Sequence, residues 1–66
     1  PEGKLNWPKV LQDQIKVVQE QLSITPLTAQ ALTRQFKRNP KGVQQVLDAL
    51  SSLGMVQEEE GVYRLV

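Results

Sequence analysis

Apolar residues recur at helical spacing through the first third of the chain. They lie four, three and four residues apart, at Leu11, Ile15, Val18 and Leu22. At about 100° per residue these side chains share one narrow stripe, and most residues between them are polar or charged. Pro8 suits the first turn of a helix, where its missing N–H costs no hydrogen bond. The pattern predicts an amphipathic helix over residues 8–22.

A proline-containing link separates this helix from a second, shorter one. Pro26 disfavours helical backbone at the residue before it, which rules out one continuous helix. We expect Ile24 and Leu27 to form a brief extended segment anchored in the core, with Ile24 pairing at a sheet edge. Thr28 is a suitable N-cap for a helix over residues 29–37. The buried side of that helix is expected to hold Ala29, Leu32 and Phe36.

The third helix has the clearest start and stop signals in the chain. Asn39 is a favoured N-cap residue, and Pro40 follows it at the helical position that best tolerates proline. Gly54 occupies the place of a C′ glycine, which commonly ends a helix. These signals bound a helix over residues 40–53. Its apolar stripe consists of Val43, Val46, Leu47, Leu50 and Leu53.

Two short segments with β-branched and aromatic side chains close the chain, at residues 55–57 and 62–66. The charged run Glu58 to Glu60, ending at Gly61, is typical of a hairpin turn. Because two strands alone are marginally stable in water, we expect the hairpin to pack against the helices. The predicted fold class is α+β, a three-helix bundle followed by a C-terminal β-hairpin.

The length and composition of the chain narrow its function class. Sixty-six residues suffice for one domain, residues 1–66, that buries roughly 60% of its unfolded surface. The chain begins with Pro1 and its one methionine is Met55, so we expect a piece excised from a longer protein, or a processed one. No apolar run approaches the roughly 20 residues of a membrane span, so no membrane partner is expected.

Cysteine and histidine are both absent, which removes disulfides, thiolate metal sites and the commonest general base. No glycine-rich phosphate loop is present, and the carboxylates are either isolated or in the exposed turn. We therefore expect no metal, no cofactor and no catalysis by the isolated domain, although its parent protein can be an enzyme. A reducing, cytoplasmic setting is the natural expectation.

Two residues near the predicted helix starts need an explanation. Trp7 is the only tryptophan and projects near the apolar stripe of the first helix. We interpret it as a lid on a small core rather than as a platform for stacking bases. Gly42 weakens a helix in its first turn, which the close approach of a backbone or of a DNA phosphate would explain.

The charges of the chain are distributed unevenly although its net charge is only +1. Four of the eight basic residues fall within eight positions: Arg34, Lys37, Arg38 and Lys41. Three glutamates follow one another at Glu58 to Glu60. Net charge alone therefore neither favours nor excludes a polyanionic partner, and the placement of the charges determines whether the chain can bind one.

The order of these elements resembles a winged helix-turn-helix domain. The resemblance assigns three segments, the positioning helix TPLTAQALTRQFK, the recognition helix NPKGVQQVLDALSSLG and the wing MVQEEEGVYRLV. More narrowly, LNWPKVLQDQIKVVQEQL followed by LTAQALTRQFK resembles a small C-terminal domain of some bacterial restriction–modification proteins and DNA methyltransferases. This second likeness implies a DNA-binding accessory of a larger enzyme.

The winged-helix resemblance implies a partner, double-stranded DNA, with the third helix in the major groove and the basic turn 34–41 on phosphates. The implied contact residues are Arg34, Lys37, Arg38, Asn39, Lys41, Gln44 and Gln45. Lysine reaches phosphate or guanine, and glutamine pairs with adenine. The alternative is that these are ordinary solvated side chains around a capped helix.

The acidic hairpin argues for a different partner. Glu58, Glu59 and Glu60 repel phosphates, so a wing that contacts DNA is not expected. They either keep the hairpin edge soluble or form a protein-binding face. The rival function is accordingly a winged helix that docks onto domains of its parent protein or onto a second copy. An apolar patch of Val10 and Val17 on the first helix would support it.

Overall fold

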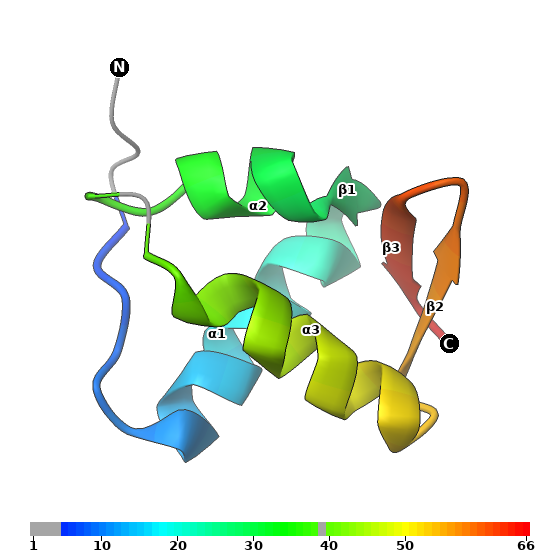
Figure 1. Cartoon of the computed structure of the whole chain (residues 1–66), viewed down its shortest axis with the longest axis horizontal. Helices are drawn as coiled ribbons and strands as arrows, with labels where there is room; N and C mark the ends of the chain where they lie inside the picture. Colours follow the sequence, from blue (N-terminus) through cyan, green and yellow to red (C-terminus); the bar gives the residue numbers. More distant parts are fainter. Residues whose placement is uncertain (1–4, 39) are drawn as a thin grey trace.

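The computed structural model describes residues 5–38 and 40–66 and contains three helices and three short strands (Figure 1). In chain order they are α1 (Leu11–Ile24), β1 (Leu27–Thr28), α2 (Ala29–Arg34), α3 (Gly42–Ser52), β2 (Val56–Glu59) and β3 (Val62–Leu65). The predicted α+β class is confirmed. The order and the small antiparallel sheet are compatible with the arrangement that the winged-helix resemblance implies.

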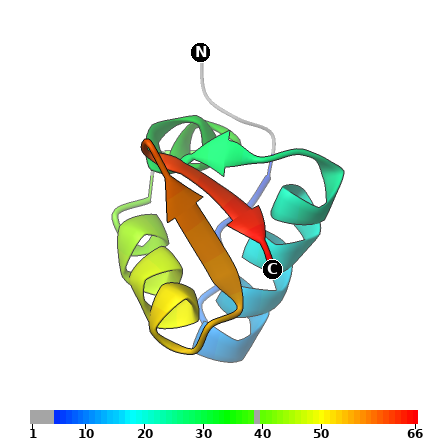
Figure 2. The ribbon, with the colours of Figure 1, turned by 90° about the vertical axis from the view of Figure 1, so that its right-hand side faces the viewer.

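The sheet is antiparallel in the order β1-β3-β2, so β3 lies between the link strand and the other arm of the hairpin (Figure 2). Leu27 of β1 pairs with Tyr63 of β3, which confirms the brief extended segment that was predicted before the second helix. The expectation that Ile24 pairs at the sheet edge is wrong. Ile24 is the last residue of α1 and its side chain is 76% exposed, because α1 continues two residues past the predicted end.

The core lies between the three helices and the sheet, and all its members except Val56 of β2 come from the predicted apolar faces of the helices. The buried apolar residues are Val18, Leu22, Leu32, Phe36, Val43, Val46, Leu47, Leu50 and Val56. The outermost stripe positions, Leu11 and Leu53, are more than half exposed because each lies at the end of its helix. Val17 packs against the core, so the predicted exposed patch of Val10 with Val17 does not form, although Val10 itself is exposed.

The helix boundaries differ from the predicted ones for reasons visible in the hydrogen bonds. Helix α1 begins at Leu11 rather than Pro8, and the carbonyl of Pro8 instead accepts a bond from the Gln14 side chain. Helix α2 ends at Arg34 rather than Lys37. The N–H of Phe36 donates to the carbonyl three residues back, which tightens the last turn and directs the phenyl ring into the core.

Helix α3 begins at Gly42, two residues after the expected first residue Pro40. Its N-cap position is taken by Lys41, whose backbone is close to helical and whose side chain makes no capping hydrogen bond. Asn39, the predicted N-cap, lies outside the described residues. The other end of the helix fits the prediction: Gly54 has a φ of 75°, its N–H donates to Ser51, and the Met55 N–H donates to Leu50. This pair of bonds is a Schellman motif.

A short segment before α1 is held against the turn between α2 and α3. The Leu5 N–H donates to the Gln35 carbonyl at 3.1 Å, and the Lys37 N–H donates to the Leu5 carbonyl at 2.7 Å. The indole of Trp7 meets the ring of Phe36 edge-on, with the centroids 4.9 Å apart and the planes at 84°. Trp7 is half-buried against the core, so its interpretation as a lid is confirmed.

The same tryptophan explains Gly42. A Cβ atom at this position would lie 3.2 Å from the indole Nε1 of Trp7, closer than a comfortable contact. The close approach expected at Gly42 is therefore that of an aromatic side chain of the domain itself. The glycine lets the start of α3 lie directly against the segment that precedes α1.

We expect the effect of Gly42→Ala to depend on Trp7. In a helix this substitution ordinarily stabilises by about 1 kcal/mol, and here the contact with the indole should remove most of that gain. In a Trp7→Phe background, which lacks Nε1, the gain should return. A double-mutant cycle from urea unfolding followed by circular dichroism measures the difference. Equal effects of Gly42→Ala in both backgrounds would contradict the explanation.

The hairpin turns within two residues, Glu60 and Gly61, whose φ angles are 54° and 84°. Positive φ at both positions is the signature of a type I′ turn, for which Asn-Gly is the preferred sequence. Glu58 and Glu59 belong to strand β2, so only one of the three glutamates lies in the predicted turn. The Glu58 carboxylate accepts a hydrogen bond from the Gly61 N–H and so fastens the turn.

Glu60→Asn should stabilise the domain by about 0.5–1 kcal/mol, since asparagine tolerates the left-handed conformation better than glutamate does. Glu60→Gln is the matched control, because it removes the same charge and keeps an unbranched side chain that disfavours positive φ. Thermal or urea unfolding of both variants gives the comparison. If the two are equally stable, charge rather than backbone conformation governs this position.

Candidate nucleic-acid interface

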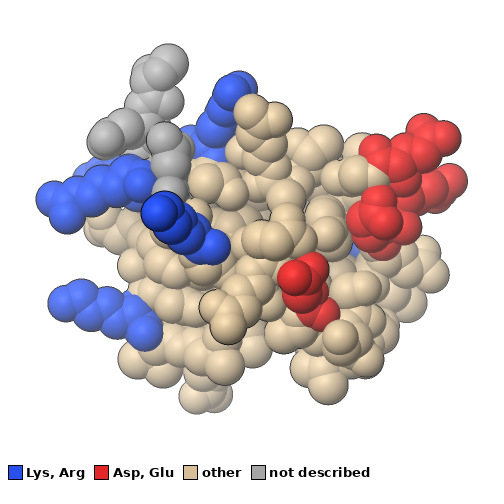
Figure 3. Space-filling view, viewed as in Figure 1, with Lys and Arg blue, Asp and Glu red and all other residues tan. Residues whose placement is uncertain are grey.

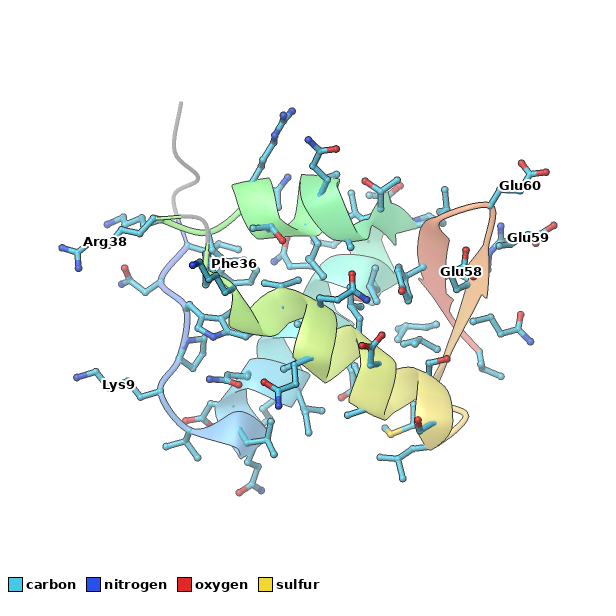
Figure 4. The ribbon with its side chains drawn as sticks, in the orientation of Figure 1. Lys9, Phe36, Arg38, Glu58, Glu59 and Glu60 are labelled. Atoms are coloured by element: carbon cyan, nitrogen blue, oxygen red, sulfur yellow. The ribbon has the colours of Figure 1, made fainter. Side chains whose placement is uncertain are left out.

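The basic residues of the predicted turn gather at one end of the molecule and the hairpin glutamates at the other (Figure 3). Arg34 lies in the last turn of α2 and Lys41 at the N-cap of α3, while Lys37 and Arg38 lie in the connection between these helices. Lys9 projects on the same side as Arg38 (Figure 4). We call this surface the basic end and define it by Lys9, Arg34, Lys37, Arg38 and Lys41, all exposed.

Hydrogen bonds hold the backbone of the basic turn at residues 35–37, although most side chains of the turn's described residues are exposed. The N–H of Lys37 is bound to the carbonyl of Leu5, and Phe36 beside it is completely buried. Arg38 has a φ of 64°, in the left-handed region where a residue with a long side chain is uncommon. Glycine or asparagine would adopt this backbone conformation at a lower cost in free energy. The presence of arginine there therefore suggests a function for its side chain.

Within residues 5–38 and 40–66 the one ion pair joins Arg64 to Glu59 at 3.6 Å, across the hairpin. Both side chains are largely exposed, so this pair contributes little to stability. The five cations of the basic end therefore have no carboxylate partner in the part of the chain that the structure describes. Arg64, the one cation of the hairpin, is already beside a glutamate.

The outward face of α3 is less open than the sequence predicted. The side-chain amide of Gln44 donates to the Asp48 carboxylate at 2.9 Å and to the Tyr63 hydroxyl at 3.1 Å. These bonds join α3 to β3, so Gln44 would have to exchange them before it could contact a base. Gln45 is exposed and, together with Lys41, remains available on the first half of the helix. Asn39, also predicted as a contact residue, lies outside the described residues.

A hollow of about 520 Å³ opens at the basic end, between the segment before α1 and the turn before α3. It is lined by Asn6, Trp7, Lys37, Arg38 and Pro40. The sequence pattern does not connect Asn6, Trp7 or Lys9 with the basic turn, because about thirty residues separate them along the chain. The one hint in the sequence is Trp7, two residues before Lys9, and it points to the basic turn only once the backbone bonds between Leu5 and the turn are known.

Other kinds of site find no support in the described part of the chain. No group of three or more acidic, histidine or cysteine residues is placed to hold a metal ion among the residues described. Likewise, no helix in the described ranges is long and apolar enough to cross a membrane.

Comparison with known proteins adds no assignment. No protein-family model, curated protein or solved structure matches this chain.

Arg38→Asn should stabilise the domain relative to Arg38→Gln by about 0.5–1 kcal/mol, because only asparagine relieves the cost of the left-handed backbone. Both substitutions remove the same positive charge, so the pair separates backbone conformation from electrostatics. Urea unfolding monitored by Trp7 fluorescence provides the measurement. Equal unfolding free energies would show that Arg38 carries no conformational cost.

Proposed function

We propose that this domain is a winged helix that binds double-stranded DNA through its basic end. The observation that supports the proposal most is the grouping of five exposed cations, without internal carboxylate partners among the described residues, around the start of α3. Cations that make no internal ion pair and stand on a fixed backbone are suited to bind phosphates, since little conformational entropy is lost in the backbone on binding.

In the proposed complex the first half of α3 enters the major groove. Lys41, at the N-cap, and Gln45 are exposed there and have side chains able to contact base edges. Gln44 is exposed as well, but it must first exchange its bonds to Asp48 and Tyr63. Arg34, Lys37 and Arg38 bind phosphates on the groove wall and fix the register of the helix. The acidic hairpin points away from the duplex, because its glutamates lie at the opposite end of the molecule from the basic turn. By its narrower resemblance, the domain would serve a larger DNA-modifying or DNA-cleaving enzyme.

A protein-binding function is the second candidate, and the hairpin favours it. Strand β2 is an edge of the sheet, so its outer backbone groups have no partner strand in the order β1-β3-β2. Next to it lie three exposed apolar side chains, Leu53, Met55 and Val66. An open strand edge beside apolar and acidic side chains fits a domain of the parent protein or a second copy better than it fits nucleic acid. Sedimentation at increasing concentration tests the second-copy version.

Binding of a fluorescently labelled duplex of about 16 base pairs tests the DNA proposal. Arg38→Gln should weaken binding several-fold and reduce the steepness of log K against log salt by about 0.9, the effect of one lost phosphate contact. Lys41→Ala, which removes a proposed base contact, should also weaken binding several-fold. Lys16→Ala is the matched control, since it removes one exposed positive charge from the middle of α1. Anisotropy titrations between about 50 and 200 mM salt give both quantities.

Two results would contradict the proposal. One is the absence of saturable duplex binding at about 50 mM salt, where counterion release favours any phosphate-binding protein. The other is an equal loss of affinity in Lys16→Ala and in the two variants of the basic end, which would indicate non-specific attraction by net charge. In either case the protein-binding candidate would remain.

A further inference from the structure

The hollow at the basic end is lined partly by residues that take no part in the proposed DNA contacts of α3 and the turn. One wall is the segment before α1, through Asn6 and Trp7, and the other is the turn, through Lys37, Arg38 and Pro40. Of the described residues that line it, two are cations and none is a carboxylate. A cavity with this lining favours an anion.

The walls of the hollow are held in place without a ligand. Two backbone hydrogen bonds join them, from Leu5 to Gln35 and from Lys37 to Leu5. The edge-on contact of Trp7 with the fully buried Phe36 fixes the indole, and the missing side chain of Gly42 gives it room. A site that exists before binding loses little free energy to reorganisation.

The hydrogen-bond donors of the lining match a tetrahedral oxyanion. Among the lining residues, Lys37 carries an ammonium group, Arg38 a guanidinium group and Asn6 an amide, and all three groups can donate hydrogen bonds to such an anion. The indole N–H of Trp7 donates no hydrogen bond to any group in the part of the chain that the structure describes. The hollow is large enough to admit a phosphate that remains attached to a nucleic-acid strand.

We infer that this hollow receives one backbone phosphate of the bound duplex, and that residues 5–9 are therefore part of the DNA interface. This inference rests on the proposed DNA-binding function and deepens it. Trp7 faces the phosphate, with Lys37 and Arg38 on the opposite wall. Lys9, which projects on the same side as Arg38, binds the neighbouring phosphate of the same strand. The segment before α1 thereby acts as a second contact element beside α3.

The fluorescence of Trp7 tests this directly, because it is the only tryptophan in the chain. Titration with an unlabelled duplex should change its emission in a saturable way, with the same dissociation constant that anisotropy gives for the labelled duplex. Lys9→Ala should weaken binding several-fold and lower the salt slope by about 0.9, whereas the control Lys16→Ala should leave the slope unchanged. Inorganic phosphate at the same phosphate concentration and ionic strength should leave the emission unchanged.

Each opposite result overturns the inference in a recognisable way. If the duplex binds and responds to Lys41→Ala while Trp7 emission stays constant and Lys9→Ala equals Lys16→Ala, the hollow is outside the interface and the proposed function stands. If inorganic phosphate alters the emission as strongly as duplex phosphate does, the hollow is a site for the free anion. If no duplex binds at low salt, both the inference and the proposed function fail.

A conservative variant separates binding from folding at the same position. Trp7→Phe keeps an aromatic ring against Phe36 and removes the indole N–H. We expect it to weaken duplex binding measured by anisotropy while its circular dichroism spectrum and its cooperative unfolding are retained. Unchanged duplex affinity in a folded Trp7→Phe domain would exclude the indole from the phosphate contact.

Discussion

The junction at which Trp7 packs between Phe36 and Gly42 is the contact on which the arrangement of the basic end depends. Phe36 is fully buried, the indole meets its edge, and the glycine at the start of α3 leaves space for the ring. Three parts of the chain that are distant in sequence meet there: the segment before α1, the end of α2 and the start of α3. This contact, together with the backbone hydrogen bonds of Leu5, brings Lys9 to the same side of the molecule as the cations of the turn.

Much of the fold could be predicted from the sequence because apolar spacing and capping signals report directly on local structure. The buried residues of α1 and α3 are those of the predicted stripes, and Gly54 ends α3 through the expected Schellman motif. The predicted helix boundaries differ from the observed ones where tertiary hydrogen bonds compete with helical ones. Lys37 leaves the helical pattern because its N–H bonds to Leu5, which no local signal in the sequence specifies.

The candidate site was predictable only in part, because some of its features depend on tertiary contacts that no local sequence signal specifies. Arg34, Lys37, Arg38 and Lys41 stood out because they are close in sequence. The engagement of Gln44 with Asp48 and Tyr63 depends on how α3 packs beside β3, and the hollow depends on two segments about thirty residues apart. The glutamates of β2 and the left-handed Arg38 likewise required backbone geometry, since neither residue type favours its observed conformation.

The separation of positive and negative ends changes what net charge means for this molecule. Its longest extent is 28 Å, whereas charges in physiological salt are screened over about 8 Å. A nearby polyanion therefore does not experience an object of charge +1. It experiences the field of whichever end of the domain is nearer, the basic end or the acidic end. Because the two ends have charges of opposite sign, a polyanion attracts one and repels the other, and this exerts a torque on the domain. A domain with its charges separated in this way would turn its basic end toward a polyanion before any contact forms, and its isoelectric point is a poor guide to its partners.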